Sequence, residues 1–368
     1  MSEAKVVSVI GERLGKLRQK LSSHDLSALI ITSSENRRYF SGFTAADNAI
    51  NSTNGCLLIL PQRQYLLTDS RFTLMANIEA PEYEIITVGA VGYGEAIKKL
   101  IDPNTTLAFE ANYLSFAQYQ DYSKTNGLRL SPCPFDPSIF RLSKSPDEIK
   151  LISKALEITE KAVGWLFERL EPGWTEEETA WFLDSSFREL GAQGSAFETI
   201  AASGPQAAMP HAVAGPKKIE KGELVVIDCG AAYQGYAADI SRTFMCGEPQ
   251  KWQKDIYRTV REAQLMAIEA IGPGVSCQKV DSIARNHIAA AGHFEHFGHS
   301  LGHGVGLAVH ESPRLSPKDN TLLVEGVVVT VEPGIYLPGQ GGVRLEQMVL
   351  VTDNGAKVLN QDNHFYDF

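Results

Sequence analysis

The chain has 368 residues, of which 43% are hydrophobic and 21% charged, and its formal net charge is -10. This length predicts two domains with a large buried core, and an acidic balance without any basic run argues against a nucleic-acid partner or a membrane surface. The five cysteines form no CxxC pair and no apolar stretch approaches the roughly 18 residues of a membrane span, so we expect a cytoplasmic protein with reduced thiols.

Helix and strand patterns alternate in the first third of the chain. Apolar residues at helical spacing predict a helix over residues 7–21. Short apolar runs predict buried strands at residues 28–32, 56–60, 65–68 and 106–109. The second and third of these strands bracket Pro61–Gln64, which indicates a hairpin. Alternation of this kind favours a small α/β domain, which we place at residues 1–137.

A proline-rich stretch separates the two predicted domains. Residues 131–137 contain three prolines and predict irregular backbone. Ser145 then begins a long helix, with Pro146 at its first position and Glu148 completing a capping box. We therefore place the second domain at residues 138–368.

Strand and helix patterns both occur in this second domain. Apolar runs predict strands at residues 223–228, 327–331 and 348–352, and helical spacing predicts helices at residues 252–271 and 277–291. The helices precede a histidine-rich segment, and strands dominate the C-terminal end.

Two aspartates frame a predicted hairpin. Asp228 ends an apolar strand and Asp239 starts the next, and residues 230–236 between them hold two glycines that can turn the chain. An antiparallel return brings both carboxylates to one face, where they repel each other unless a cation lies between them. Cys229 would face the other side, so we do not count it as a ligand. Two ordinary turn aspartates are the alternative interpretation.

Residues 293–310 hold five of the nine histidines. Among these, His303 lies in a glycine-flanked segment where backbone can approach a ligand closely, and a neutral histidine is a common metal ligand. A hydrogen-bonded structural histidine is the alternative for each, and we retain it for His293 and His296. The segment lacks the spacing and the preceding strand of a nucleotide-binding loop.

Two glutamates follow in the C-terminal part of the domain. Glu332 comes directly after a predicted buried strand, where an uncompensated charge is costly. Glu346 lies two residues after Arg344, so in a strand both side chains would face one side. Arg344 is suited to hold a metal-bound carboxylate or to receive a substrate carboxylate, and an ordinary salt bridge is the alternative. Oxygen donors with one nitrogen favour Mn²⁺, with Co²⁺, Fe²⁺ or Zn²⁺ as alternatives, over a structural zinc.

Taken in order, these contexts resemble the pita-bread metallopeptidases, a family that includes aminopeptidase P, prolidase and methionine aminopeptidase. Phe197–Ile200, Ser203–Gly204 and Pro210–His211 are also similar to the family's segment before the first aspartate. The resemblance implies an α+β fold, with a pita-bread (creatinase/aminopeptidase) catalytic domain preceded by a smaller creatinase-like α/β domain. It also implies two divalent metal ions, bridged by Asp239 and Glu346. The implied ligands are Asp228, Asp239, His303, Glu332 and Glu346.

The same resemblance implies catalytic roles for further residues. His211, His299 and His310 match histidines that support the site or bind substrate, and Arg344 matches an arginine of the proline-directed members. In the implied mechanism, a hydroxide bridging the two metals attacks the scissile carbonyl, and Glu332 takes the proton from the attacking water. His211 and His310 would hydrogen-bond the carbonyl or the tetrahedral intermediate.

Two motifs of the first domain narrow the implied activity. Asn36–Phe43 and Leu67–Phe72 resemble short bacterial aminopeptidase P and prolidase proteins, whereas methionine aminopeptidases lack such a domain. We expect an Xaa-Pro aminopeptidase, acting as a homodimer on peptides with proline in the second position. One alternative is a prolidase restricted to Xaa-Pro dipeptides. Another is a catalytically inactive pita-bread protein that binds a peptide or protein, although such proteins usually lose ligands and all five are present here.

Overall fold

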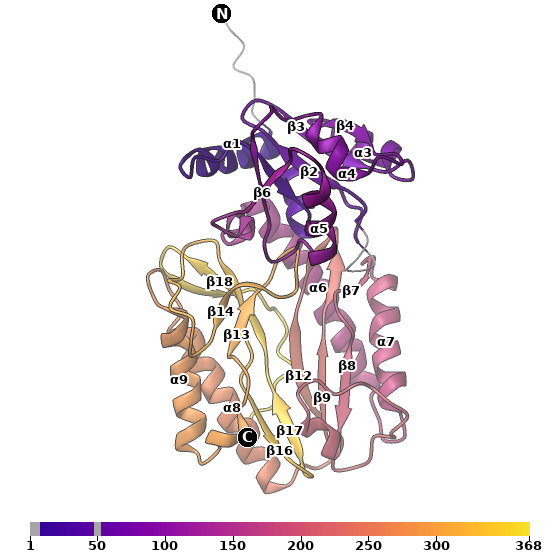
Figure 1. Cartoon of the computed structure of the whole chain (residues 1–368). Helices are drawn as coiled ribbons and strands as arrows, with labels where there is room; N and C mark the ends of the chain where they lie inside the picture. The colour runs from indigo at the N-terminus through magenta and orange to yellow at the C-terminus, as the bar shows by residue number, and fades with distance from the viewer. Residues whose placement is uncertain (1–7, 48–52) are drawn as a thin grey trace, which may run out of the picture. The chain divides into compact units, whose positions relative to one another are not determined.

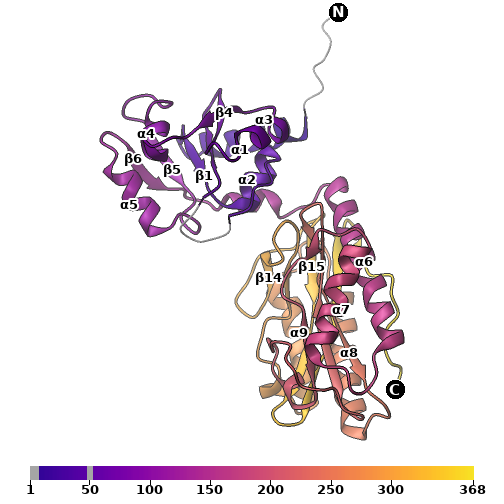
Figure 2. The same cartoon turned by 90° about the vertical axis from the view of Figure 1, so that its right-hand side faces the viewer.

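The computed structural model describes residues 8–47 and 53–368, so the predicted helix start at Val7 lies outside the described residues. The chain divides into two compact units, residues 1–140 and 141–368. Figures 1 and 2 draw both units from two directions.

A six-stranded sheet organises the first unit, in the order β4-β3-β2-β1-β5-β6. Its strands are β1 (Leu29–Ile31), β2 (Cys56–Ile59), β3 (Gln64–Thr68), β4 (Glu84–Thr87), β5 (Thr106–Phe109) and β6 (Arg129–Pro132). Its helices are α1 (Val9–Ser22), α2 (Ser34–Ser41), α3 (Thr73–Glu79), α4 (Gly92–Lys98) and α5 (Phe116–Lys124). The predicted hairpin is confirmed, since β2 and β3 pair antiparallel with Ile59 opposite Gln64. The mixed sheet with its helices confirms the predicted α/β character.

The edge strand β6 runs into the proline-rich stretch that we predicted to be irregular. Ser131 and Pro132 pair in parallel with β5, so the prediction is wrong for these two residues. Proline lacks the N–H that a ladder needs, but it is tolerated at edge strands, and Pro132 is the last residue of this one.

The second unit places its strands between two pairs of helices (Figures 1 and 2). The helices are α6 (Pro146–Arg169), α7 (Glu176–Glu189), α8 (Lys251–Glu269) and α9 (Cys277–Ala290), and the short 3-10 helices are η2 (Gly204–Ala208) and η3 (Phe294–His296). A further 3-10 helix, η1 (Pro137–Arg141), spans the boundary between the two units. The strands are β7 (Gly194–Ser195), β8 (Ile200–Ser203), β9 (Leu224–Cys229), β10 (Ala231–Tyr233), β11 (Tyr236–Ala237), β12 (Ile240–Met245), β13 (Gly302–Gly304), β14 (Glu311–Leu315), β15 (Val328–Val331), β16 (Gly334–Leu337), β17 (Gly341–Arg344), β18 (Gln347–Thr352) and β19 (Gly355–Val358). One hydrophobic core joins α6 and α7 to β9 and β12, and a second joins α8 and α9 to β15 and β18.

Helix α6 begins where the sequence predicts. The Ser145 hydroxyl accepts a hydrogen bond from the Glu148 backbone N–H at 3.3 Å, and the Glu148 carboxylate accepts one from the Ser145 N–H at 2.9 Å. The Glu148 carboxylate also accepts a hydrogen bond from the Tyr236 hydroxyl at 2.9 Å, which ties the start of α6 to β11. The predicted capping box is confirmed, and it anchors the helix to the sheet.

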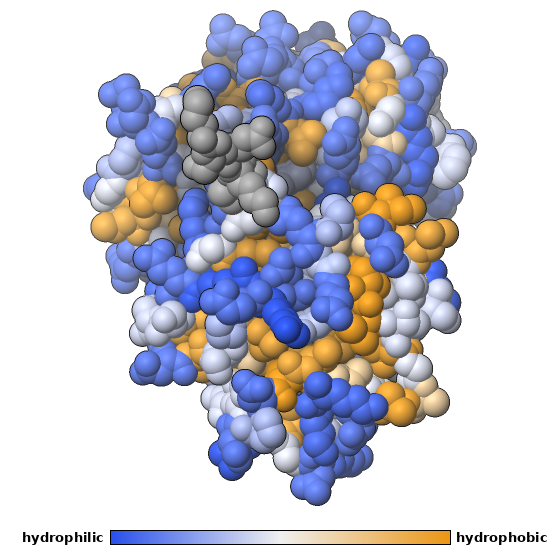
Figure 3. All heavy atoms as spheres, turned by 90° about the horizontal axis from the view of Figure 1, so that it is seen from above, coloured by the Kyte–Doolittle hydropathy of each residue, from blue (hydrophilic) through white to orange (hydrophobic). Residues whose placement is uncertain are grey.

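No helix in residues 8–47 and 53–368 is both long and apolar enough to cross a membrane. On the face drawn in Figure 3, hydrophilic side chains predominate and hydrophobic ones gather in separate patches between them. The longest helix, α6, buries one side in the core and exposes charged residues such as Lys150 on the other.

Candidate metal centre

The first pair of carboxylates lies at adjoining strands, Asp228 in β9 and Asp239 directly before β12. β9 and β12 are antiparallel, with Asp228 opposite Ser241. Asp239 precedes Ser241 by two residues, so its side chain lies on the same face as that of Asp228. The predicted antiparallel return is confirmed, although β12 begins one residue later than expected, at Ile240. Cys229 is buried in the hydrophobic core on the opposite face, as predicted.

The second pair of carboxylates lies at the end of another antiparallel ladder. β15 and β18 pair with Val331 opposite Gln347, which is the last pair of the ladder. One further step in this register would set Glu332 opposite Glu346. Like charges in directly opposed positions destabilise a sheet, which agrees with the end of the pairing before this step.

Arg344 and Glu346 do not share one strand. β17 ends at Arg344, and Leu345 and Glu346 lie in neither β17 nor β18, so the expectation of a continuous strand is wrong. The backbone leaves the ladder because the Glu346 N–H donates to the carbonyl oxygen of Ser241 in the other sheet, at 3.0 Å. The Arg344 guanidinium forms an ion pair with Asp228 at 2.7 Å instead of one with Glu346.

The hydroxyl of Ser241 links Arg344 to Glu346. Arg344 Nε donates to Ser241 Oγ at 2.8 Å, and this oxygen donates to Glu346 Oε2 at 3.0 Å. The guanidinium of Arg344 thus contacts Asp228 directly and Glu346 through the hydroxyl of Ser241. It therefore connects the carboxylate of β9 with the one beside β18.

The strand β13 carries His303 between two glycines. A Cβ on Gly302 would lie 2.0 Å from the carbonyl oxygen of Thr330, and one on Gly304 would lie 2.3 Å from that of Ser312. The glycines therefore let β13 fit between β14 and β15, which is a different reason from the close ligand approach that the sequence indicated.

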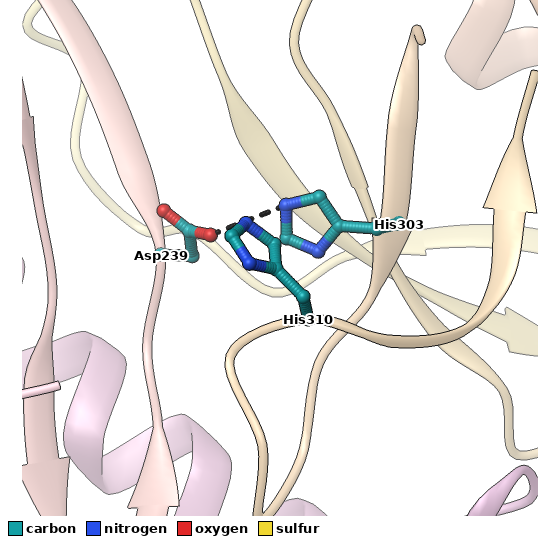
Figure 4. Close-up of side chains that lie close together, drawn as sticks. All are labelled: Asp239, His303 and His310. Carbon is teal, nitrogen blue, oxygen red and sulfur yellow. Dashed lines mark ion pairs between the residues drawn. The ribbon is translucent and has the colours of Figure 1, made fainter. Parts of the chain in front are cut away.

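The imidazole of His303 points at the carboxylates. Its Nδ1 lies 3.1 Å from the Gly304 carbonyl oxygen, an acceptor that requires the proton to sit on Nδ1. Its Nε2 lies 3.4 Å from Asp239 Oδ2 and 3.3 Å from Glu332 Oε1. Figure 4 shows Asp239, His303 and His310 converging from three segments, with the ring of His310 against that of His303.

The carboxylate and imidazole groups form three overlapping clusters, and within each cluster the potential ligand atoms lie within 4.8 Å of one another. The clusters are Asp228–Asp239–Glu346, His303–Glu332–Glu346 and Asp239–His303–His310. All five residues that the sequence indicated as ligands occur in them. His310, which we expected to bind substrate, is the sixth member.

Burial and mutual repulsion perturb the acids. Burial raises the pKa of Asp239 and of Glu346 well above the usual range, and the neighbouring carboxylates raise both further. Burial also acts to raise the pKa of Glu332, but the hydrogen bond and charge of His303 outweigh it, so the net shift is downward. In the metal-free protein, protons bound to these carboxyl groups reduce the repulsion between the acids. A bound cation would replace the protons in that role.

The donor set fits divalent cations. Asp228 Oδ1 and Glu346 Oε1 are buried and, within the described part of the chain, accept no hydrogen bond. Buried polar atoms are usually satisfied, so such oxygens require another partner. The four carboxylates carry more negative charge than the guanidinium of Arg344 can balance, which favours the binding of cations. Oxygen donors with imidazole are typical of Mn²⁺, Co²⁺ and Fe²⁺ sites.

A cavity of about 600 Å³ opens onto these groups. Four of the predicted catalytic residues, His211, His299, His310 and Arg344, lie in its wall together with Glu332. Glu346 does not reach the cavity surface and is only 1% exposed. The cavity therefore offers space for a substrate in front of the acids.

Sequence reasoning missed Tyr336, which joins two of the predicted residues. Its hydroxyl accepts a hydrogen bond from Arg344 Nη1 at 3.0 Å and lies 2.8 Å from His299 Nε2. His299 Nδ1 lies 2.8 Å from the Ser300 carbonyl oxygen, so both ring nitrogens are engaged by the protein. The number of residues between Tyr336 and Arg344 gives no sequence signal for a contact. The pairing of β16 with β17 brings the two side chains together.

Comparison with known proteins identifies the family. Residues 150–353 match metallopeptidase family M24, and residues 13–139 match the creatinase/prolidase N-terminal domain. An Xaa-Pro dipeptidase from Pyrococcus horikoshii is 38% identical over 358 residues, which cover 96% of this chain and 98% of the relative. Two solved structures each cover 96% of this chain, with 98% of their own chains aligned: an Xaa-Pro dipeptidase from Bacillus anthracis (TM-score 0.89, 35% identity) and an X-Pro aminopeptidase from Thermotoga maritima (TM-score 0.86, 36% identity). The predicted pita-bread fold with a smaller N-terminal domain is confirmed, and the chain belongs to metallopeptidase family M24.

Proposed function

We propose that the protein is a metal-dependent Xaa-Pro dipeptidase. The motifs of the first domain favoured an aminopeptidase, but the relatives from Pyrococcus horikoshii and Bacillus anthracis are Xaa-Pro dipeptidases, and they support the dipeptidase alternative better. The structural neighbour from Thermotoga maritima, an X-Pro aminopeptidase, keeps that activity as the second candidate.

The observation that carries the proposal is the cluster of four acids onto which the cavity opens. We infer that Asp228, Asp239, His303, Glu332 and Glu346 hold two divalent cations, with Mn²⁺ favoured. When bound, such a pair polarises a scissile carbonyl and lowers the pKa of water. Asp228 Oδ1 and Glu346 Oε1, buried oxygens that accept no hydrogen bond from residues 8–47 and 53–368, support this assignment.

Within this site, Glu332 is suited to proton transfer. The opposing effects of burial and of His303 leave its pKa below the usual value, so its carboxylate is ionised at neutral pH and can accept the proton of an attacking water. His211 and His310 line the cavity and can donate to the carbonyl oxygen of the substrate. His299 has a supporting role, because both of its ring nitrogens already face protein groups.

Arg314 offers the contact that a dipeptide requires. A dipeptide differs from a longer peptide because the carboxylate of its proline is free, and a guanidinium binds a carboxylate through paired hydrogen bonds. Arg344 is already bonded to Asp228, Ser241 and Tyr336. Arg314, by contrast, is exposed in the cavity wall on β14, opposite His303 in the pairing with β13.

The test compares three substrates, Ala-Pro, Ala-Pro amide and Ala-Pro-Ala, with the Mn²⁺-loaded protein. A dipeptidase should release alanine from Ala-Pro and leave Ala-Pro-Ala intact. Arg314→Gln should raise the KM for Ala-Pro about 10- to 100-fold, as expected for one lost charged hydrogen bond, without changing the KM for the amide. The matched control is Lys318→Gln, an exposed cation that does not line the cavity. Efficient cleavage of Ala-Pro-Ala would favour the aminopeptidase.

A further inference from the structure

Gln264 is a fully buried residue of α8, and both the nitrogen and the oxygen of its side-chain amide form hydrogen bonds. Its Nε2 donates to the carbonyl oxygens of Val331, at 3.0 Å, and Leu345, at 2.8 Å, and its Oε1 accepts from Arg261. An amide NH₂ has two donors, and both are engaged. The reversed amide would set its oxygen against two carbonyls, so the surroundings fix this orientation.

The two carbonyls belong to the residues directly before the two glutamates of the site. Val331 is the last residue of β15 and precedes Glu332, and Leu345 lies between β17 and β18 and precedes Glu346. No ladder pair joins the chain at Glu332 and Glu346, because the pairing of β15 with β18 ends one residue earlier. A backbone hydrogen bond, from the Leu345 N–H to the Pro333 carbonyl oxygen at 3.4 Å, joins the two segments here, and Gln264 adds two shorter bonds to the residues directly before the glutamates.

The hydrogen bonds of Gln264 lie beside the glutamates of the proposed metal site. Glu332 and Glu346 share a cluster with His303, so the spacing of their backbones sets how closely the two carboxylates can approach one cation. The hydrogen bonds of Gln264 fix the spacing of the two carbonyls and hence limit the spacing of the carboxylates. They do not reach Asp228 and Asp239, because both donors of the amide are used.

We propose that Gln264 is a positioning residue for the cation held by His303, Glu332 and Glu346, and that it affects the second cation less, because only Glu346 of the two glutamates also clusters with Asp228 and Asp239. The inference rests on the proposed metal site. Groups that orient metal ligands typically change metal affinity by about 10- to 100-fold when removed. A purely structural role would instead weaken both binding steps equally or leave both unchanged.

The test uses Gln264→Met, which keeps the volume of the side chain and removes both donors. Chelator-treated full-length protein is titrated with Co²⁺ by calorimetry, and visible absorption follows the coordination of each ion. We expect two binding steps in the wild type and, in the variant, a loss of about 10- to 100-fold in one of them with a smaller loss in the other. Gln264→Asn, with a shorter amide, should give the same selective loss and serves as a second variant if the first fails to fold.

A matched control lies on the same helix. Gln253 is also a buried glutamine of α8, and its Nε2 donates to the Gly222 carbonyl oxygen at 2.8 Å, away from the glutamates. Gln253→Met should leave both binding steps unchanged. Unchanged steps in both Gln264 variants, or an equal loss in both steps, would overturn the inference. A wild-type protein that binds no Co²⁺ would instead overturn the proposed metal site itself.

Discussion

Replacing Glu346 with glutamine should stabilise the metal-free protein. Glu346 is 1% exposed, and its carboxylate lies with those of Asp228, Asp239 and Glu332 in clusters no wider than 4.8 Å. Glutamine has nearly the same shape, and its side-chain oxygen can still accept the hydrogen bond from Ser241. The substitution therefore removes charge without opening a cavity.

The magnitude follows from the separation of the charges. Two unit charges 4.8 Å apart repel by about 3 kcal/mol at an effective dielectric constant of 20. Attraction to Arg344 offsets part of this repulsion, so we expect the free energy of unfolding to rise by about 1–3 kcal/mol in the variant. For a domain of this size, each kcal/mol corresponds to roughly 2–4 °C in Tm.

The gain should depend on pH with a definite sign. Burial, followed by the charges of Glu332 and Asp228, raises the pKa of Glu346 in the folded state. A raised carboxyl pKa means that the fold holds the proton more tightly, so its stabilising contribution is present at low pH and is lost as pH rises. The wild type should thus resemble the variant near pH 5 and fall below it by about pH 8.

Urea denaturation of chelator-treated protein at several pH values measures this difference. Glu325→Gln, at an exposed position of the same unit, is the control and should change nothing. Added Mn²⁺ should reverse the order, since a bound ion stabilises only the protein that retains its ligands. A metal-free Glu346→Gln protein that is no more stable than the wild type at pH 8, or a difference that does not vary with pH, would refute the reasoning.

Three further substitutions test other parts of the site and fold. His310→Ala should keep both ions but lose about 10²–10³-fold in kcat on Ala-Pro, because one donor to the carbonyl oxygen is removed; metal analysis and steady-state kinetics check this. Arg344→Lys should lower both kcat and Mn²⁺ affinity, measured by calorimetry, since an ammonium cannot replace the branched contacts of the guanidinium. Burial and the neighbouring Asp362 raise the pKa of Glu160 to about 7, so its stabilising contribution is complete below its ordinary value of 4.5 and disappears as pH rises through 7. Glu160→Gln should therefore flatten the fall in Tm between about pH 5 and 8, as followed by thermal denaturation.

The ligand candidates could be found from the sequence because each lies in a recognisable local context. Asp228 and Glu332 close apolar runs, and His303 lies between glycines, so local pattern alone indicates where they lie. The antiparallel return from Asp228 to Asp239 was also predictable, because a short glycine-containing segment joins their strands. These features depend on contacts that are local in sequence.

The rest depends on contacts between distant elements, which leave no local signal. Gln264 reads as an ordinary helical residue until α8 packs against the ends of β15 and β17. Tyr336 reaches Arg344 only through strand pairing, and Arg314 enters the cavity only because β14 pairs with β13. The break of the strand before Glu346 likewise follows from its bond to Ser241, 105 residues earlier. The homodimer that the resemblance implies stays a prediction.

The most direct test of the proposed function is the release of proline from Ala-Pro by one preparation in three states: Mn²⁺-loaded, chelated and reloaded. Metal content is measured in each state. We predict two ions per chain in the loaded and reloaded states, turnover in both, and none in the chelated state. Hydrolysis that persists in the metal-free protein, or a folded protein that binds two ions without cleaving Ala-Pro, would contradict the assignment.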